Sequence, residues 1–141
     1  MTERISEAVW KGSLKDGKGS VKLGSGAYEG PYTFASRFES GSGTNPEELI
    51  GAAHAGCYSM ALSGALDKEG FKAEHIHTVA KVKLEMIDGK AAITHIHLDT
   101  EAKIPGISEE QFAQVAEDVK LTCPVSVALS QVPMSLTARL L

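Results

Sequence analysis

Short segments with the residue types of β-strands alternate with polar breaks over the first forty residues. Two of them, 5–11 and 20–23, are joined by a turn signal at 15–19, and residues 32–38 form a third predicted strand. This order predicts a small antiparallel sheet at the start of the chain.

A long segment with almost no charge follows a flexible connector at residues 41–44. Asn45, Pro46 and two acidic residues form a helix start, with a cap, a proline and negative charge at the positive end of the helix dipole. Apolar and small residues continue to about Glu69, and Gly70 ends the helix. Such a helix is about 35 Å long and has no polar face. Because one short chain can hardly cover it, we expect an obligate homodimer.

Two alternating segments, 73–86 and 91–104, flank an Asp-Gly pair at 88–89 and predict a β-hairpin. A two-residue turn at that pair would place the apolar Val82 opposite the polar His95. The apolar faces of the two strands coincide only if the loop has an odd number of residues. We therefore expect a three-residue loop.

The last third of the chain predicts two helices and a strand. Ser108 and the acidic residues after it cap a helix that extends to about Leu121, a short helix follows Cys123, and a strand covers about 134–140. The order of strands, helix, hairpin, helices and strand predicts an α+β fold with antiparallel sheets, in a single domain over residues 1–141.

Composition and charge exclude several classes of protein. Hydrophobic residues make up 43% of the chain and charged residues 23%, which is ordinary for a globular domain. The net charge is -4 and the lysines are scattered, so a nucleic-acid partner is not expected. We find no signal-peptide core and no segment that approaches the roughly 20 apolar residues of a bilayer span. We expect a cytoplasmic protein with no membrane partner.

The two cysteines, Cys57 and Cys123, are too few to form a disulfide scaffold. Cys57 lies in the middle of the long helix, where a free cysteine is most often a small buried apolar residue. Cys123 precedes a proline at a helix start, so its sulfur occupies the N-cap, where free N–H groups and the helix dipole stabilise a thiolate. Cysteine is a poor cap compared with Ser, Thr, Asp or Asn, which favours sulfur chemistry at this position.

A thiol in the middle of a buried helix needs a nearby cation to ionise, because burial alone raises its pKa. His54, three residues before Cys57 on the same helix face, and Arg37, at the end of the third predicted strand, are the two candidates. A buried histidine readily loses its proton, whereas arginine stays charged. We therefore prefer Arg37.

The residues around these candidates resemble a known family. The matching motifs are Arg37-Phe38-Glu39, the run from Gly43 to Cys57, and Cys123-Pro124-Val125-Ser126. They are similar to the OsmC (osmotically inducible protein C) branch of the OsmC/Ohr organic hydroperoxide reductases, and the order of segments agrees over nearly the full length. The resemblance implies an OsmC-like fold, an intertwined homodimer with two active sites at the subunit interface, no bound cofactor and a role in oxidative or osmotic stress.

The resemblance also implies a role for each site residue. Cys57 would be the peroxidatic thiolate, Cys123 the resolving thiol, Arg37 the activating cation and Glu47 the carboxylate that holds it. The thiolate would attack an organic hydroperoxide, release an alcohol and become a sulfenic acid, which the second thiol converts into a disulfide. An external dithiol must then reduce the enzyme, and the family suggests lipoyl groups, as on a lipoylated protein.

The spacing of Glu47 and Cys57 limits how Arg37 can act. The two residues are ten positions apart, about 15 Å along an unbroken helix, which is too far for one arginine head to contact both. We expect either a break in the helix near Gly51, or an Arg37 that serves Cys57 while Glu47 only steers its stem or swings away.

Four histidines suggest a metal site as one alternative. His75 and His77 share a face of one predicted strand, and His95 and His97 share a face of the next. With a three-residue loop, His77 lies near an acidic residue of the neighbouring strand rather than opposite a histidine. A solvated strand face is the simpler interpretation, and we expect no metal.

A second alternative is a dimeric binding protein with idle thiols, whose cavity holds an apolar ligand, because fold does not guarantee activity. Both thiols, the arginine and the carboxylate are all present in this chain. A protein that had lost its activity would be free to lose any of them, so the catalytic interpretation is preferred.

Overall fold

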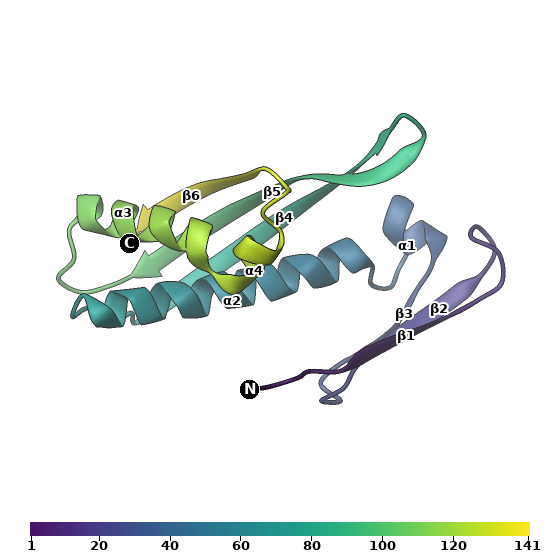
Figure 1. Ribbon diagram of the computed structural model, residues 1–141, viewed down its shortest axis with the longest axis horizontal. Coiled ribbons are helices and arrows are strands. Elements are labelled where there is room, and N and C mark those ends of the chain that lie inside the picture. The colour runs from purple at the N-terminus through teal and green to yellow at the C-terminus, as the bar shows by residue number, and fades with distance from the viewer. The chain divides into compact units, whose positions relative to one another are not determined.

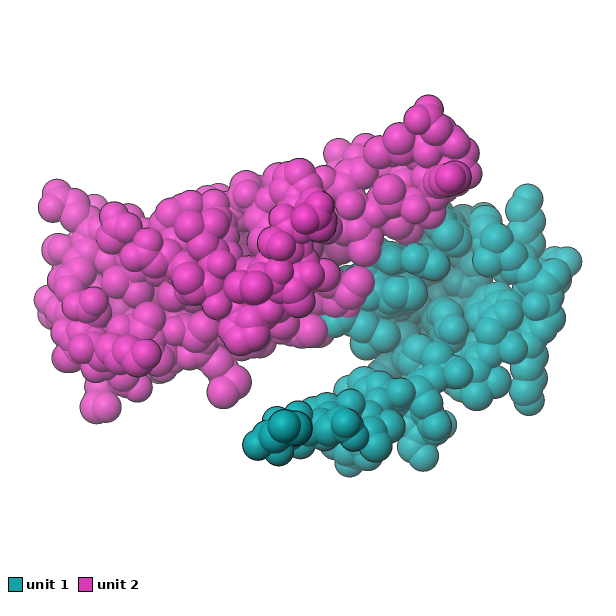
Figure 2. All heavy atoms as spheres, in the orientation of Figure 1, with its two compact units in different colours: residues 1–49 teal, residues 50–141 magenta.

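The computed structural model describes residues 1–141 and divides them into two compact units, Met1–Leu49 and Ile50–Leu141. Figure 2 colours the two units, and each is described by itself. The helices and strands, in chain order, are β1 (Ser6–Lys11), β2 (Lys18–Leu23), β3 (Glu29–Tyr32), α1 (Phe34–Phe38), α2 (Pro46–Lys68), β4 (His75–Ile87), β5 (Lys90–Lys103), α3 (Glu109–Thr122), α4 (Pro124–Ala128) and β6 (Met134–Leu140).

The first unit contains the antiparallel sheet expected at the start of the chain, with strand order β1-β2-β3. Gly19 pairs with Trp10 on one side and with Tyr32 on the other, and the two rings meet with their centroids 5.2 Å apart. A Cβ on Gly19 would lie 2.6 Å from an atom of each ring. The close aromatic contact across this sheet therefore requires glycine at the central position.

The third predicted strand is wrong over most of its length, because β3 ends at Tyr32 and α1 follows. Thr33 caps this helix: its hydroxyl accepts the Ser36 N–H at 3.1 Å, while the Ser36 hydroxyl accepts the Thr33 N–H at 2.8 Å. This reciprocal capping box satisfies two N–H groups that a helix start otherwise leaves free. Arg37 consequently lies in the last turn of a helix and not at the end of a strand.

The long helix is confirmed as α2. The Asn45 side chain accepts the Glu48 N–H at 2.7 Å at its start, and Gly70, with φ +89°, follows its end. The helix continues without interruption from Pro46 to Lys68, so the break expected near Gly51 as one of two alternatives is not found.

One face of α2 is buried within the second unit and the opposite face is not. Tyr58, Leu62 and Leu66, one helical turn apart, are all 0% exposed. On the other side lie small or apolar residues that nothing in the second unit covers, and Met60 among them is 80% exposed. Side chains of this kind on an open helix face are typical of a surface that another molecule covers.

By length and composition alone, α2 could also cross a membrane. The sequence-based statement that no segment approaches the length of a bilayer span is therefore wrong for α2. Alanine, glycine and serine extend the run of uncharged residues between the ends of this helix. The core helix of a globular protein satisfies the same criterion, and α2 has such a core face in the second unit.

The β4–β5 hairpin is confirmed, but its loop differs from the prediction. Asp88 and Gly89, with φ +50° and +78°, make a two-residue turn between the paired Ile87 and Lys90. A β-bulge at Thr94 then supplies the extra residue, so that beyond it the two apolar faces coincide. The one extra residue that brings the two apolar faces together is therefore located in strand β5 and not in the loop.

The second sheet has strand order β4-β5-β6 and departs from the antiparallel expectation at its last strand. β6 pairs parallel with β5, because the chain crosses back through α3 and α4 before it enters β6. Figure 1 shows α2, α3 and α4 beside this sheet. The core between them contains Ile96 and Leu98 from β5, Leu62 from α2 and Phe112 from α3.

Candidate active site

Cys123 lies where α3 ends and α4 begins, and it is the N-cap of α4. Its side chain is 1% exposed, and its sulfur accepts the backbone N–H of Ser126 at 3.4 Å. Pro124 occupies the first turn of α4. The predicted position of this sulfur at the N-cap of a helix is therefore confirmed.

The structure brings the second predicted thiol, Cys57 of α2, next to Cys123. The pKa of Cys57 is raised above its ordinary value, chiefly by burial and further by the hydrogen bond and charge of Cys123. The backbone N–H of Val125, in the first turn of α4, acts in the opposite direction and favours the thiolate. Both cysteines are free thiols. Cys57 also packs against the core cluster that includes Cys123. Two neighbouring thiols can form a disulfide on oxidation.

No cation of the second unit favours ionisation of Cys57, since none contributes to its pKa. His54 is completely buried, and its Nε2 lies 2.7 Å from the hydroxyl of Ser126. Burial lowers the pKa of His54, so the ring is neutral at neutral pH. His54 therefore supplies no positive charge to Cys57, and the preference for Arg37 stays a prediction.

The sequence did not predict the contact between His54 and Ser126. The two residues are separated by 72 positions, and neither has a spacing that marks a site. Ser126 also lies 3.1 Å from the sulfur of Cys123, so a buried hydrogen-bonded network leads from the imidazole to the thiol. The only signal in the sequence was the position of Ser126 three residues after a cysteine cap, where its N–H meets the capping atom.

In the first unit, Arg37 and Glu47 form the ion pair that the family resemblance implies. Arg37 Nε donates to Oε1 of Glu47, and Nη2 donates to Oε2, both at 3.0 Å. The carboxylate is 8% exposed and the arginine 35%. A bidentate pair of this kind fixes the orientation of the guanidinium as well as its position.

An apolar groove of about 210 Å³ lies beside Arg37 within the same unit. The guanidinium carbon also stands 5.3 Å from the centroid of the Phe38 ring. The groove is lined by Trp10, Leu14, Tyr32, Thr33, Phe34, Arg37 and Phe38. A cation with an aromatic surround can hold the polar end of a molecule whose remainder is hydrocarbon.

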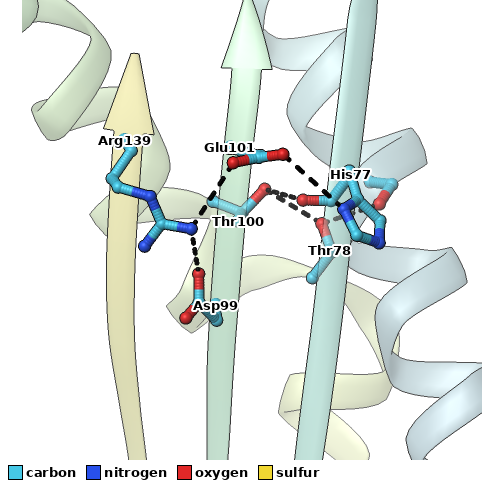
Figure 3. Close-up of polar contacts among 7 residues, drawn as sticks. His77, Thr78, Asp99, Thr100, Glu101 and Arg139 are labelled. Atoms are coloured by element: carbon cyan, nitrogen blue, oxygen red, sulfur yellow. Dashed lines mark hydrogen bonds and ion pairs between the residues drawn. The ribbon is translucent and has the colours of Figure 1, made fainter. Parts of the chain in front are cut away.

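Three of the four strand histidines, His77, His95 and His97, have polar partners on the solvent face of the second sheet. His77 pairs with Glu101, as predicted, with 3.8 Å between Nδ1 and Oε1, and Figure 3 shows Glu101 between His77 and Arg139. His95 and His97 both contact one hydroxyl, that of Ser135. No group of three or more His, Cys, Asp or Glu residues has the geometry to hold a metal ion.

Three comparisons place this chain among known proteins. Residues 39–137 match the family model described as OsmC-like protein. The chain is 48% identical over 124 residues to peroxiredoxin OsmC of Escherichia coli K12, with 87% of each chain covered. The OsmC-like protein of Mycoplasma pneumoniae has a TM-score of 0.76 at 16% identity, covering 99% of this chain and 98% of that one. The organic hydroperoxide resistance protein OhrB of Bacillus subtilis has a TM-score of 0.70 at 19% identity, covering 95% and 97%.

An α+β fold with two neighbouring free thiols is typical of a thiol-dependent redox protein. The family match and the identity with a peroxiredoxin make the class more specific, a cysteine-based peroxidase. The chain belongs to the OsmC-like family.

The strength of the Arg37–Glu47 pair can be measured with adjacent glutamates. Glu47→Gln removes the charge that holds Arg37, whereas Glu48→Gln removes a charge from the same helix end without touching the pair. We expect Glu47→Gln to lower the free energy of unfolding by about 1–2 kcal/mol more than Glu48→Gln, because Glu47 loses a bidentate ion pair with Arg37 whereas Glu48 weakens only one hydrogen bond, from Thr44. Urea unfolding of both variants checks this, and equal losses would contradict it.

Proposed function

We propose that this protein reduces organic hydroperoxides to alcohols, with Cys57 as the peroxidatic thiolate and Cys123 as the resolving thiol. The observation that carries the proposal is the contact of the two thiols, in a chain that belongs to a family of cysteine-based peroxidases. Neither a metal nor a bound cofactor is required for this chemistry.

The proposed cycle has three balanced steps. The Cys57 thiolate attacks one peroxide oxygen, the O–O bond breaks, and the leaving alkoxide takes a proton to become the alcohol. The sulfur is now a sulfenic acid, which the Cys123 thiolate attacks to form a disulfide, releasing hydroxide that is protonated to water. An external dithiol then reduces the disulfide by exchange. We propose a lipoylated protein as that reductant, on the basis of the family resemblance.

The preference for organic peroxides is supported by the apolar groove beside Arg37. Its aromatic lining favours a hydrocarbon substituent over the small, fully polar hydrogen peroxide. The Bacillus subtilis protein of the same fold is named for resistance to organic hydroperoxides.

Arg37 is proposed as the activating cation of Cys57, and Glu47 as the carboxylate that orients it. The thiol requires such help, because burial raises its pKa and no cation within Ile50–Leu141 opposes this. Arginine suits this role since it cannot discharge itself by losing a proton. Since α2 is unbroken and Glu47 binds the guanidinium head rather than the stem, we propose that Glu47 swings away from Arg37 when Arg37 serves a Cys57 of the same chain.

We further propose that the protein acts as an intertwined homodimer in the cytoplasm. The face of α2 with Gly56, Met60 and Gly64 is exposed within one chain, and a second copy would cover it. In the family the active sites lie at the subunit interface, so Arg37 can come from either subunit. The cytoplasm is a reducing compartment and would return the thiols to their active state, which supports the cytoplasmic assignment.

The catalytic roles of the cysteines are tested by adding cumene hydroperoxide to the reduced protein. We expect peroxide loss together with a decrease in intact mass of two hydrogens per chain. Cys123→Ser should consume one equivalent and stop at a sulfenic acid, which dimedone traps, and Cys57→Ser should be inactive. Undiminished turnover in Cys57→Ser would require another nucleophile and would sink the proposal.

The role of Arg37 is tested through the pH dependence of Cys57 alkylation by iodoacetamide, followed by peptide mass. Loss of the cation should raise the pKa of Cys57, so the midpoint in Arg37→Ala should move to higher pH than in the wild type. Arg4→Ala, which removes an exposed arginine from the same unit, is the control. An unshifted midpoint in Arg37→Ala would show that another group ionises the thiol.

The dimer is tested with a charge on the open face of α2. Met60→Arg should reduce the molar mass measured by light scattering from that of two chains to that of one, because a buried unpaired charge opposes association. Leu121→Arg, a similar change at a 65% exposed leucine of α3, should leave the dimer intact. A wild-type protein with the mass of a single chain would refute this assembly.

A further inference from the structure

A buried network of three side chains leads to the sulfur of Cys123, and the reaction proposed above for Cys57 with peroxide assigns it no role. The Cys123 thiol donates to the hydroxyl of Ser126 at 3.1 Å, and this hydroxyl lies 2.7 Å from Nε2 of His54. The exposed fractions of the three side chains are 1%, 3% and 0%. The other ring nitrogen of His54, Nδ1, is buried and has no hydrogen-bond partner.

We propose that Ser126 and His54 form a proton relay for Cys123. In the forward direction the thiol proton passes to the hydroxyl oxygen of Ser126, while the hydroxyl proton passes to Nε2 of His54. Ser126 contacts the reacting sulfur, and His54 is a positioning residue that acts through it. The inference rests on the proposed function, in which Cys123 resolves the sulfenic acid.

The need for a relay follows from the burial of Cys123. Only the thiolate attacks a sulfenic acid at a useful rate, so the proton must leave the sulfur first. With the side chain 1% exposed, water and buffer bases have little access to that proton. An internal base connected by hydrogen bonds removes the obstacle, and His54 is the basic group at the other end of the connection.

The step balances without any further reactant. The Cys123 thiolate forms the S–S bond as the S–O bond of the Cys57 sulfenic acid breaks, and the departing hydroxide takes up a proton to give water. The proton that water formation consumes is the one that His54 received, so the ring is neutral again once the disulfide has formed. When a dithiol later reduces the disulfide, it releases two protons: one goes to Cys57, and the other reaches the Cys123 thiolate through His54 and Ser126.

The surroundings of His54 leave its ring neutral and available as a base. Burial lowers its pKa, and no charged group contributes to the shift. The ionisable groups near the network are the thiols Cys57 and Cys123, the Tyr58 phenol and the Glu117 carboxylate, which acts on Tyr58. The inner strand face of the core carries Ala80, Val82, Ile96 and Leu98, none of which ionises.

The unpartnered Nδ1 distinguishes a relay from a purely structural hydrogen bond. A buried polar atom without a partner costs free energy, and a structural contact with Ser126 needs only one ring nitrogen. A histidine whose second nitrogen is bound has one fixed tautomer. With Nδ1 free, Nε2 can either accept from Ser126 or donate to it, as a relay that works in both directions requires.

The test is a single turnover of the reduced full-length protein with one equivalent of cumene hydroperoxide, with sulfenic acid and disulfide followed by rapid quench and intact mass. Ser126→Ala breaks the relay, and His54→Gln keeps a hydrogen-bonding group for Ser126 but has no titratable nitrogen. We expect both to slow disulfide formation by about 100-fold, so that the sulfenic acid accumulates. Ser126→Thr, which keeps the hydroxyl, should restore the wild-type rate, and Ser130→Ala on the surface should match the wild type.

The pH profile of disulfide formation separates the relay from a structural effect. In the wild type, the rate should be flat between about pH 6.5 and 8.5, because His54 is already neutral there. In His54→Gln and Ser126→Ala it should rise roughly tenfold per pH unit, as hydroxide becomes the base. Formation of sulfenic acid in each variant shows that the variant is folded. If His54→Gln forms no sulfenic acid, the comparison of Ser126→Ala with Ser126→Thr tests the relay alone.

Two results would overturn the inference. Disulfide formation in Ser126→Ala at the wild-type rate and with a flat pH profile would show that the hydroxyl carries no proton. A wild-type protein that forms no disulfide between Cys57 and Cys123 would remove the proposed function and the relay with it. The second failure is visible in the wild type alone, and the first only in the variants, so they cannot be confused.

Discussion

The packing of α2 against the second sheet and α3 is the constraint on which the arrangement of the thiols depends. Its buried face inserts Tyr58, Leu62 and Leu66 into the core, and the Tyr58 hydroxyl donates to the carbonyl of Ala116 in α3 at 2.9 Å. Because these contacts fix the rotation of α2, Cys57 meets the sulfur at the start of α4. Two cysteines far apart in the sequence become neighbours through the hydrophobic core and not through any local motif.

The same burial sets the charge state of the groups at the site. It raises the pKa of Cys57 and lowers the pKa of His54, so both shifts favour the neutral form. Only the Val125 N–H favours the thiolate within this unit. The hydrocarbon surroundings that hold Cys57 in place therefore also favour its protonated form. Under the proposed function, reactivity depends on bringing the permanent charge of Arg37 to this thiol.

Features determined by local chemistry were predictable from the sequence. The uncharged run with Asn45 before it predicted α2, and a cysteine before a proline predicted that a sulfur would cap α4. The third predicted strand was wrong because the aromatic residues obscured the capping box of Thr33 and Ser36. The contact of His54 with Ser126 could not be predicted, since it exists only after two distant helices have packed.

The β4–β5 hairpin shows how a mistaken detail can accompany a correct register. The apolar faces coincide as predicted, with Val82 paired with Ile96, while the additional residue lies at Thr94 and not in the turn where it was expected. Side-chain alternation constrains only whether the number of residues between two facing positions is odd or even. It does not say where along the chain that number is adjusted.

This parity rule has a consequence for how the hairpin can vary among related chains. A single insertion or deletion in the turn would reverse the facing of every residue between it and the next irregularity, unless a second change of one residue restores the count. The segment between the tip and Thr94 can therefore lengthen or shorten in compensated pairs while the core beyond it remains untouched. Sequence alignments of this region should show gaps that shift between strand and turn while the total parity is preserved.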